Sequence, residues 1–257
     1  MKKLFFLTQN LIGQLLVLKN EFEYMCGFVA CFYKKSFEFS KDDFINSLDQ
    51  IHHRGPDSTG YMKFDIGSNT LALGHKRLSI IDLNNSGNQP MMSSSKRFTI
   101  LFNGEIYNHQ ILRKTISDFL NYNWKGSCDT ETLVNLFELY DDKKAITKIS
   151  GQFALLIYDH KKNVIKIVGD RAGEKPLYVC LNNEYIGFSS DLIAFRKFPK
   201  FNSTISHEAL SGLLKFNYIP SPLSIFKNCF KIPSGSIIEI DLNIFLPTNE
   251  DSFEGFL

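Results

Sequence analysis

Short apolar runs separated by polar clusters dominate the chain, and most of these runs are typical of strands. Clusters rich in Asn, Gly and Ser lie between the runs, and Asn182-Asn183 between two of them predicts a hairpin turn. The predicted strands span residues 26–33, 70–74, 78–82, 98–102, 152–158, 164–169, 177–181, 185–189 and 236–241.

Other segments carry apolar residues at helical spacing. Ser40, followed by Asp42 and Asp43, predicts the start of a helix that reaches Ile51. A serine side chain can cap the first backbone N–H groups of a helix, and carboxylates are favourable in its first turn. Further helices are predicted at 109–120, 130–140 and 207–216. Because helices bracket runs of consecutive strands rather than alternating with them, the pattern predicts an α+β fold of antiparallel sheets covered by helices.

Composition places the chain among globular proteins. Of its 257 residues 44% are apolar and 22% charged, which excludes a disordered chain, a collagen or a coiled coil. The net charge of +2 gives no electrostatic case for nucleic acid or an anionic membrane as a partner. The longest unbroken apolar run, Phe153–Tyr158, is far shorter than the about 20 residues of a membrane-spanning helix. The five cysteines are scattered, without zinc-site or disulfide-framework spacing, so a reducing compartment and no metal are expected.

The two ends differ from the rest of the chain. Residues 1–24 begin with two lysines and a partly apolar stretch, but polar residues interrupt it and no small-residue cleavage site follows. Since Met25 directly precedes Cys26, we interpret residues 1–25 as an extension upstream of the true start or one that is removed. Residues 242–257 show no period and are predicted to be an irregular tail. The domain is therefore expected at 26–241.

Cys26 is the first candidate for chemistry. A thiol with a pKa of about 8.5 is only slightly ionised at neutral pH. If the residues before it were removed, its own α-amine, with a pKa of about 8, could take the thiol proton. The alternative is a small buried hydrophobe at a strand start, the role expected for Cys31. The histidines show no metal-ligand pattern and are predicted to be structural: His52, His53 and His75.

Polar residues elsewhere have two interpretations each. The Asn103 amide and the Gly104 N–H could form paired donors for an oxyanion, or a turn after the strand at 98–102. Arg77 could bind a carboxylate or end a strand at the solvent. Asp129 and Glu105 could accept hydrogen bonds from an ammonium, and Asp129 could instead cap a helix. Together these residues predict a site for a zwitterionic amino acid.

Eight motifs occur in this order along the chain: MCGFVA, HRGPDSTG, GHKRLSIIDL, QPM, FNGEIYNH, GSCDTE, GQFALLIYD and DRAGEKPLY. With later stretches such as YIPSP (218–222) and KIPSG (231–235), they cover residue 25 to about 241. They closely resemble the N-terminal glutaminase half of glutamine-hydrolysing asparagine synthetases, which are class II glutamine amidotransferases of the N-terminal-nucleophile hydrolase superfamily. This implies a four-layer αββα sandwich of two antiparallel sheets.

The resemblance also implies a reaction. Cys26 would attack the side-chain amide of L-glutamine, and its α-amine would act as base and then protonate the leaving ammonia. Asn103 and the Gly104 N–H would hold the oxyanion. A thioester at Cys26 would then be hydrolysed to L-glutamate. The partner would be a synthetase domain or subunit that accepts the ammonia.

Substrate binding is implied for a further set of residues. Arg77 would bind the glutamine carboxylate, with the backbone of Ile80 and Ile81 nearby. Glu105 and Asp129 would receive the α-ammonium. Residues 53–57 would shape the pocket without a chemical step of their own.

The sequence also departs from the family. Retained residues 1–25 would convert the α-amine into an amide without useful basicity. No SGG-x-DS pyrophosphate loop is found, so we expect no cofactor in this domain, and ATP and Mg²⁺ only in the missing synthetase half. Gly169-Asp170-Arg171 stands where the family usually has Arg-Asp-Arg, which is expected to loosen a structural contact.

The leading hypothesis is a cytoplasmic glutaminase portion of an asparagine synthetase. One alternative is an amidotransferase that supplies ammonia to another acceptor, such as a sugar. The other is a catalytically silent remnant that binds a partner or glutamine.

Overall fold

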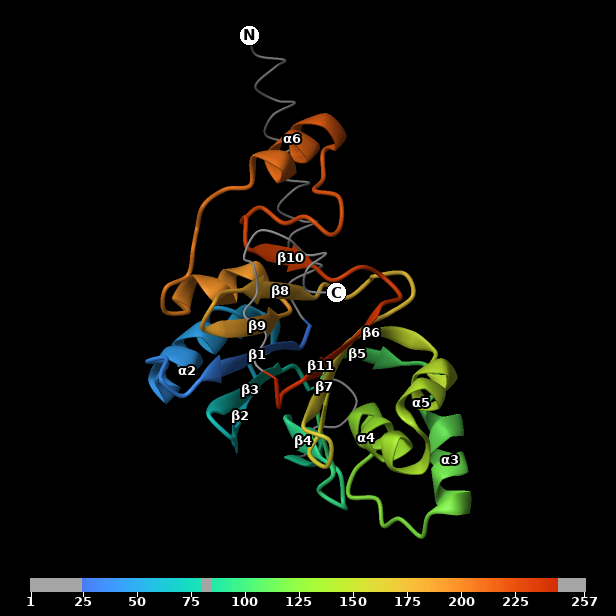
Figure 1. Cartoon of the computed structure of the whole chain (residues 1–257). Helices are drawn as coiled ribbons and strands as arrows, with labels where there is room; N and C mark the ends of the chain where they lie inside the picture. Colours follow the sequence, from blue (N-terminus) through green and yellow to red (C-terminus); the bar gives the residue numbers. More distant parts are fainter. Residues whose placement is uncertain (1–24, 80–84, 245–257) are drawn as a thin grey trace.

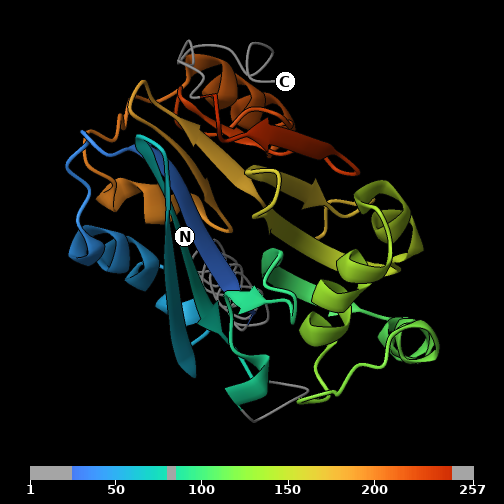
Figure 2. The same ribbon diagram turned by 60° about the horizontal axis from the view of Figure 1, so that its bottom comes forward.

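Two antiparallel sheets lie face to face, with helices on both outer sides (Figures 1 and 2). The structure is a computed structural model, and it describes residues 25–79 and 85–244. In this part of the chain, the first sheet has the strand order β10-β8-β9-β1-β3-β2 and the second the order β11-β7-β6-β5-β4. Every pairing between neighbouring strands is antiparallel.

The first sheet is formed by β1 (Gly27–Lys34), β2 (Ser58–Ile66), β3 (Asn69–Arg77), β8 (Tyr178–Leu181), β9 (Tyr185–Ser189) and β10 (Cys229–Lys231). The second is formed by β4 (Met91–Met92), β5 (Phe98–Ile106), β6 (Gly151–Asp159), β7 (Val164–Gly169) and β11 (Ile237–Asp241). The helices are α2 (Lys41–Asp49), α3 (His109–Phe119), α4 (Asp129–Leu139), α5 (Asp142–Lys148) and α6 (His207–Phe216), with short 3₁₀ turns η1 (His52–Arg54), η2 (Asn85–Gly87) and η3 (Leu192–Lys197).

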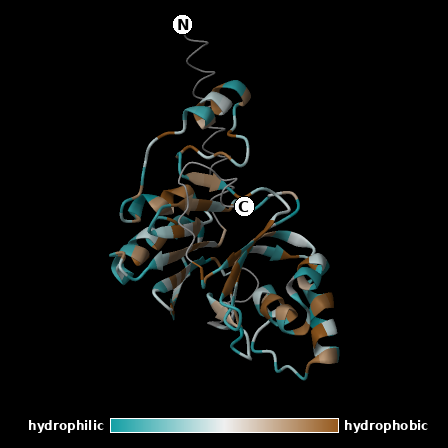
Figure 3. Ribbon diagram, viewed as in Figure 1, coloured by the Kyte–Doolittle hydropathy of each residue, from teal (hydrophilic) through white to brown (hydrophobic). Residues whose placement is uncertain are grey.

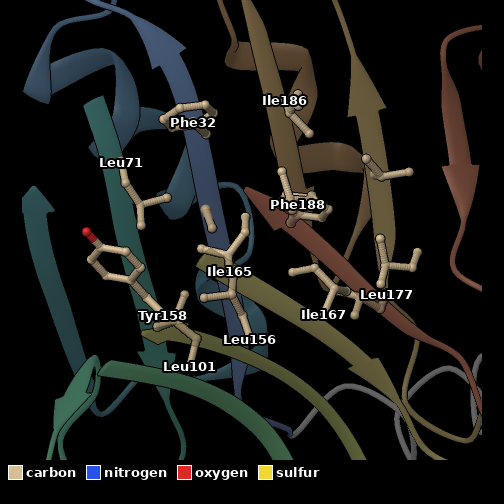
Figure 4. Close-up of a cluster of buried hydrophobic side chains, with 14 of the residues drawn as sticks. Phe32, Leu71, Leu101, Leu156, Tyr158, Ile165, Ile167, Leu177, Ile186 and Phe188 are labelled. Atoms are coloured by element: carbon tan, nitrogen blue, oxygen red, sulfur yellow. The ribbon is translucent and has the colours of Figure 1, made fainter. Parts of the chain in front are cut away.

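The main hydrophobic core fills the space between the sheets (Figure 4). Phe32 and Leu71 of the first sheet face Leu101, Leu156 and neighbouring side chains of the second, and all are buried. Alternate residues of each strand point into this layer because side chains along a strand alternate between its two faces. Figure 3 shows hydrophobic residues on these strands and on the helices beside the second sheet.

Two further clusters cover the outer faces of the sheets. The outer face of the second sheet packs against α3, α4 and α5, through residues such as Phe98, Leu136 and Phe137. The outer face of the first sheet packs against α2 and η3, through residues such as Phe44 and Phe195. The layers therefore run helix, sheet, sheet, helix, and the predicted four-layer αββα sandwich is confirmed.

Most of the predicted elements are present. The start of α2 forms as expected: Ser40 Oγ accepts a hydrogen bond from Asp43 N at 3.0 Å, and Ser40 N donates to Asp43 Oδ2 at 3.2 Å. The hairpin at Asn182 also forms, since the backbones of Asn182 and Tyr185 exchange two hydrogen bonds between β8 and β9.

Some boundaries in the sequence prediction were wrong. The strand predicted at 98–102 continues to Ile106, because β5 stays paired with β6 along that whole length. Leu78 and Ser79 belong to no strand, and the rest of the run predicted at 78–82 lies outside the described residues. Among the described residues, no helix has both the length and the apolar character needed to cross a membrane.

Candidate active site

A cavity of about 290 Å³ lies where both sheets and the start of α4 meet. This volume is at the lower end of the roughly 300–1,000 Å³ typical of small-molecule pockets. Residues 25 and 26 enter it just before β1, Arg77 from the end of β3, residues 102–105 from β5 and residues 128–130 from α4. The lining is completed by Leu78, Gly87, Gln89, Gln152 and Lys175.

The Cys26 thiol lies in this cavity, partly exposed. Its Sγ accepts a hydrogen bond from Leu78 N at 3.3 Å. Burial raises the pKa of the Cys26 thiol, and the Leu78 hydrogen bond and the charge of Arg77 offset that effect only in part. The thiol therefore needs a base to become a nucleophile at neutral pH.

Asn103 and Gly104 lie across the cavity on β5. Their backbones pair with Ala154 and Phe153 of β6, so the alternative interpretation of Asn103-Gly104 as a turn is wrong. A Cβ on Gly104 would overlap the Gln152 carbonyl oxygen, so this position requires glycine. The Asn103 side chain is only 1% exposed, and its Nδ2 has no hydrogen-bond partner among the described residues. A buried unpaired donor costs about 1–3 kcal/mol, so this amide is poised for an acceptor in the cavity.

Side chains of two other segments hold β5 in place just before Asn103. Gln89 Nε2 donates to the Phe102 carbonyl at 3.1 Å, and Phe102 N donates to Gln89 Oε1 at 2.6 Å. His75 Nε2, on β3, donates to the same carbonyl at 3.1 Å. Burial lowers the pKa of His75 to about 4, so this ring is neutral at physiological pH. The structural role predicted for His75 agrees with this position.

Arg77 is the last residue of β3, and it is buried rather than facing solvent. Its Nη1 donates to Asn88 Oδ1 at 2.9 Å. A Cβ on Gly87 would overlap Nη2, so glycine at this position leaves room for the guanidinium. The local fold therefore directs a cation into the cavity.

Two acids complete the charge pattern. Asp129 is the first residue of α4, and the residue that precedes the helix as N-cap is Cys128, so the capping role considered for Asp129 was wrong. Its Oδ2 accepts a hydrogen bond from Ile106 N at 3.0 Å, and burial raises the pKa of the Asp129 carboxyl. Glu105 is exposed and lines the same cavity. With Arg77, these acids give the cavity the charges that a zwitterionic amino acid requires.

Residues 53–57 pack behind the cavity. Arg54 Nε donates to the Cys26 carbonyl at 3.3 Å, and Asp57 Oδ2 accepts a hydrogen bond from Ser79 N at 2.7 Å. Neither side chain is among the residues that line the cavity. Ile80 and Ile81, predicted to offer backbone contacts to the substrate, lie outside the described residues.

Sequence reasoning missed Lys175, although it lies within the quoted motif DRAGEKPLY. Its Nζ is 2.7 Å from Met25 Sδ. The loop that carries it is held by Asp170, whose carboxylate accepts hydrogen bonds from the backbone N–H groups of Phe153, Ala172, Glu174 and Lys175. Gln89 and Gln152 were likewise given no role. In residues 25–79 and 85–244, no group of three or more His, Cys, Asp or Glu could hold a metal ion.

Comparisons with known proteins identify relatives of this chain. The model of the glutamine amidotransferase domain family matches residues 25–248. Glutamine-hydrolyzing asparagine synthetase 1 of Bacillus subtilis is 34% identical over 215 residues, which is 82% of this chain and 33% of that protein. Putative glutamine-hydrolyzing asparagine synthetase 2 of Methanocaldococcus jannaschii is 32% identical over 77% of this chain and 41% of that protein. The chain thus spans between a third and about two fifths of the length of these two relatives.

A solved structure shares the fold. Glutamine phosphoribosylpyrophosphate amidotransferase from B. subtilis, solved with ADP and GMP, has a TM-score of 0.55 and 18% sequence identity. The match covers 66% of this chain and 43% of that one. It supports the layered architecture at the level of the fold.

Proposed function

The chain belongs to the glutamine amidotransferase domain family, and from that premise we propose that it is the glutaminase portion of an asparagine synthetase. It hydrolyses L-glutamine to L-glutamate and ammonia. One observation carries the proposal: the unpartnered Asn103 Nδ2 and the Cys26 thiol lie in the wall of one cavity. A nucleophile beside a preorganised donor is the arrangement that acyl transfer from an amide needs.

Substrate binding follows from the charges of the cavity. Arg77 receives the α-carboxylate, because a guanidinium can bind a carboxylate through two parallel hydrogen bonds. Asp129 and Glu105 receive the α-ammonium. These contacts fix one end of the molecule and leave its side-chain amide directed toward Cys26.

The reaction begins when the Cys26 sulfur attacks the amide carbon. The thiol proton passes to the α-amine of Cys26, and the developing oxyanion accepts hydrogen bonds from Asn103 Nδ2 and Gly104 N. Collapse of this intermediate breaks the C–N bond, and the protonated amine returns its proton to the departing ammonia. Water then hydrolyses the thioester, with the amine again as base, and releases glutamate.

The α-amine is needed because the cavity offers no better base. Its titratable side chains other than Cys26 are Arg77, Glu105, Asp129, Lys175 and the buried thiol of Cys128, with no histidine among the described lining residues. In the uncut chain the Cys26 nitrogen is an amide, which is not basic. We therefore assign activity to the form that begins at Cys26.

The acceptor of the ammonia is proposed from the relatives. The two relatives named above, from B. subtilis and M. jannaschii, carry the names of glutamine-hydrolyzing asparagine synthetases, and this chain covers only part of each. A synthetase domain or subunit would use the ammonia, with ATP and Mg²⁺, to amidate aspartate. The free Cys26 thiol favours a reducing compartment such as the cytoplasm.

The decisive experiment compares three purified proteins: the chain from Met1, the chain that begins at Cys26, and the latter carrying Cys26→Ala. Glutamate release from L-glutamine is measured, together with intact mass before and after the assay. We expect turnover only from the form that begins at Cys26. Turnover by an unprocessed chain, or by Cys26→Ala, would refute the assignment of nucleophile and base. No turnover by any form would favour a silent remnant.

A further inference from the structure

Lys175 is a second cation in the wall of the cavity, and the reaction described above gives it no role. The residue is half-buried, and its ammonium contacts the side chain of Met25, the residue bonded to the Cys26 nitrogen. Four backbone hydrogen bonds to the Asp170 carboxylate, one of them from Lys175 itself, fix the loop from which it extends. Lys175 is therefore held beside the start of β1 by a rigid support.

A further cation lies close to the same backbone. Arg54 is 7% exposed, its Nε donates to the Cys26 carbonyl, and its Nη2 is buried without a partner among the described residues. Burial, followed by the charge of Arg54, lowers the pKa of the Lys175 ammonium. The nitrogen of Cys26 thus lies in a locally positive environment.

The acids near Lys175 are largely committed elsewhere. Asp170 is occupied by backbone N–H groups, Glu174 is exposed to solvent, and Glu105 receives the substrate ammonium in the proposed function. Arg77 and Asp129, which act on the thiol, bind opposite ends of the substrate. The charge of Asp191 acts on Arg54 and favours its charged form, so Arg54 has a carboxylate partner nearby. With glutamine bound, Lys175 is the cation that remains beside the Met25 side chain.

We propose that Lys175 is a positioning residue that keeps the α-amine of Cys26 neutral, so that this amine can accept the thiol proton. The inference rests on the proposed function. Removal of Met25 frees the Cys26 nitrogen and also removes the sulfur that Lys175 contacts. The lysine ammonium then faces a newly formed amine, and two like charges in one site disfavour protonation of the weaker base.

The sign of the effect follows from the ordinary pKa values. A free α-amine has a pKa of about 7.7–8.0 and is mostly protonated, hence inactive as a base, below that pH. The ordinary pKa of a lysine, about 10.4, lies well above that of the α-amine, so the amine is the weaker base of the pair and its protonation is the one that is disfavoured. Its presence moves the acid limb of activity to lower pH, and its removal moves that limb back to higher pH.

The test uses Lys175→Met and Lys175→Arg in the form that begins at Cys26. In Lys175→Met we expect the acid limb of kcat to rise by about one pH unit, which is roughly a tenfold loss near pH 6 and little loss near pH 9. Lys175→Arg keeps the charge and should restore the wild-type profile. Lys34→Met, at a half-buried lysine at the opposite end of β1 from Cys26, serves as the matched control and should leave the profile unchanged.

A readout independent of turnover separates this inference from the proposed function. The ¹⁵N resonance of the Cys26 amine is titrated in the wild type and in Lys175→Met. An upward shift of its midpoint in the variant supports the inference even if the protein shows no glutaminase activity, in which case only the proposed function fails. An equal loss of kcat at every pH, or an unchanged amine titration, would overturn it.

Discussion

At the scale of single residues, the site depends on two places where a missing Cβ makes room for a functional group. Gly104 lets β5 approach the Gln152 carbonyl, and Gly87 lets the guanidinium of Arg77 occupy the cavity. The first neighbour is backbone and cannot give way, whereas the second is the end of a flexible side chain. Substitution of Gly104 should therefore disturb the pairing of the strand, and substitution of Gly87 should disturb mainly the position of Arg77.

Gly87→Ala tests this distinction. The new methyl group displaces the Arg77 guanidinium, so we expect the KM for L-glutamine to rise about 10- to 100-fold, the cost of roughly 1.5–3 kcal/mol for a charge-assisted hydrogen bond. The kcat should change little, because Cys26, Asn103 and Gly104 are untouched. Steady-state kinetics and a thermal melt check both statements. A fall in kcat at unchanged KM would contradict the role given to Arg77.

Some residues of the cavity could be named from the sequence, and others could not. Cys26, Asn103 and Arg77 could be named as candidates because their combination, together with the family motifs that contain them, indicates one chemistry, although each alone had a second interpretation. Lys175 could not, because a lysine in a loop has no such pattern, and its significance comes from Met25, which is 150 residues away in sequence. Asp129 lines the cavity, but as a helix cap it was predicted one position too late, since the N-cap is Cys128.

At the scale of elements, the errors have physical causes. Asn103-Gly104 has the composition of a turn, and only the pairing with β6, which no local pattern reveals, keeps this dipeptide in a strand. β2 was missed because it is an edge strand with many exposed positions and so lacks a clear apolar face. The buried strands β7 and β9, in contrast, were predicted with the observed boundaries because their residues are apolar nearly throughout.

The hydrogen bond from His75 of β3 to the Phe102 carbonyl of β5 predicts that the stability of the fold depends on pH. His75 is fully buried, and its pKa is lowered to about 4 in the folded state from an ordinary value of about 6.5. Between these two values the unfolded chain binds a proton that the folded chain does not, so stability must fall as pH decreases from about 6.5 to 4. We expect this residue to contribute a loss of about 3 kcal/mol over that range, measured by urea unfolding at each pH. A His75→Gln variant, which cannot titrate, should show a correspondingly smaller slope, and an identical slope would contradict the assignment.

The helices differ in how firmly they are anchored. In α4 Leu136 is fully buried, whereas in α6 only Ala209 is buried and Leu214 is 79% exposed. Leu136→Ala should therefore cost about 2–5 kcal/mol of unfolding free energy, and Leu214→Ala less than about 0.5 kcal/mol. Denaturant unfolding measures the loss of unfolding free energy in each variant. The two losses can be compared directly because the same side chain is truncated in both. An equal loss of unfolding free energy in the two variants would contradict the exposure of Leu214 on α6.

At the scale of the whole molecule, the cavity is shared between layers rather than contained in one of them. Cys26 and Arg77 come from the first sheet and its ends, Asn103 and Gly104 from the second, and Asp129 from the outer helix α4. A ligand that contacts all of these groups links three layers of the sandwich. Binding free energy should therefore appear as stability of the entire fold, because the unfolded chain has no such site.

This coupling can be measured without turnover in the Cys26→Ala variant of the form that begins at residue 26. L-glutamine at about 100 times its Kd should raise the unfolding free energy by about 2.7 kcal/mol, and the increase should follow the logarithm of its concentration. D-glutamine is the matched control, because its ammonium and carboxylate cannot both reach Asp129 and Arg77 while its amide faces residue 26. Equal stabilisation by the two enantiomers would mean that the ligand is held by general charge rather than by this arrangement. If neither enantiomer stabilises the protein, no glutamine links the three layers. That result would count against glutamine as the substrate, independently of the reactivity of Cys26.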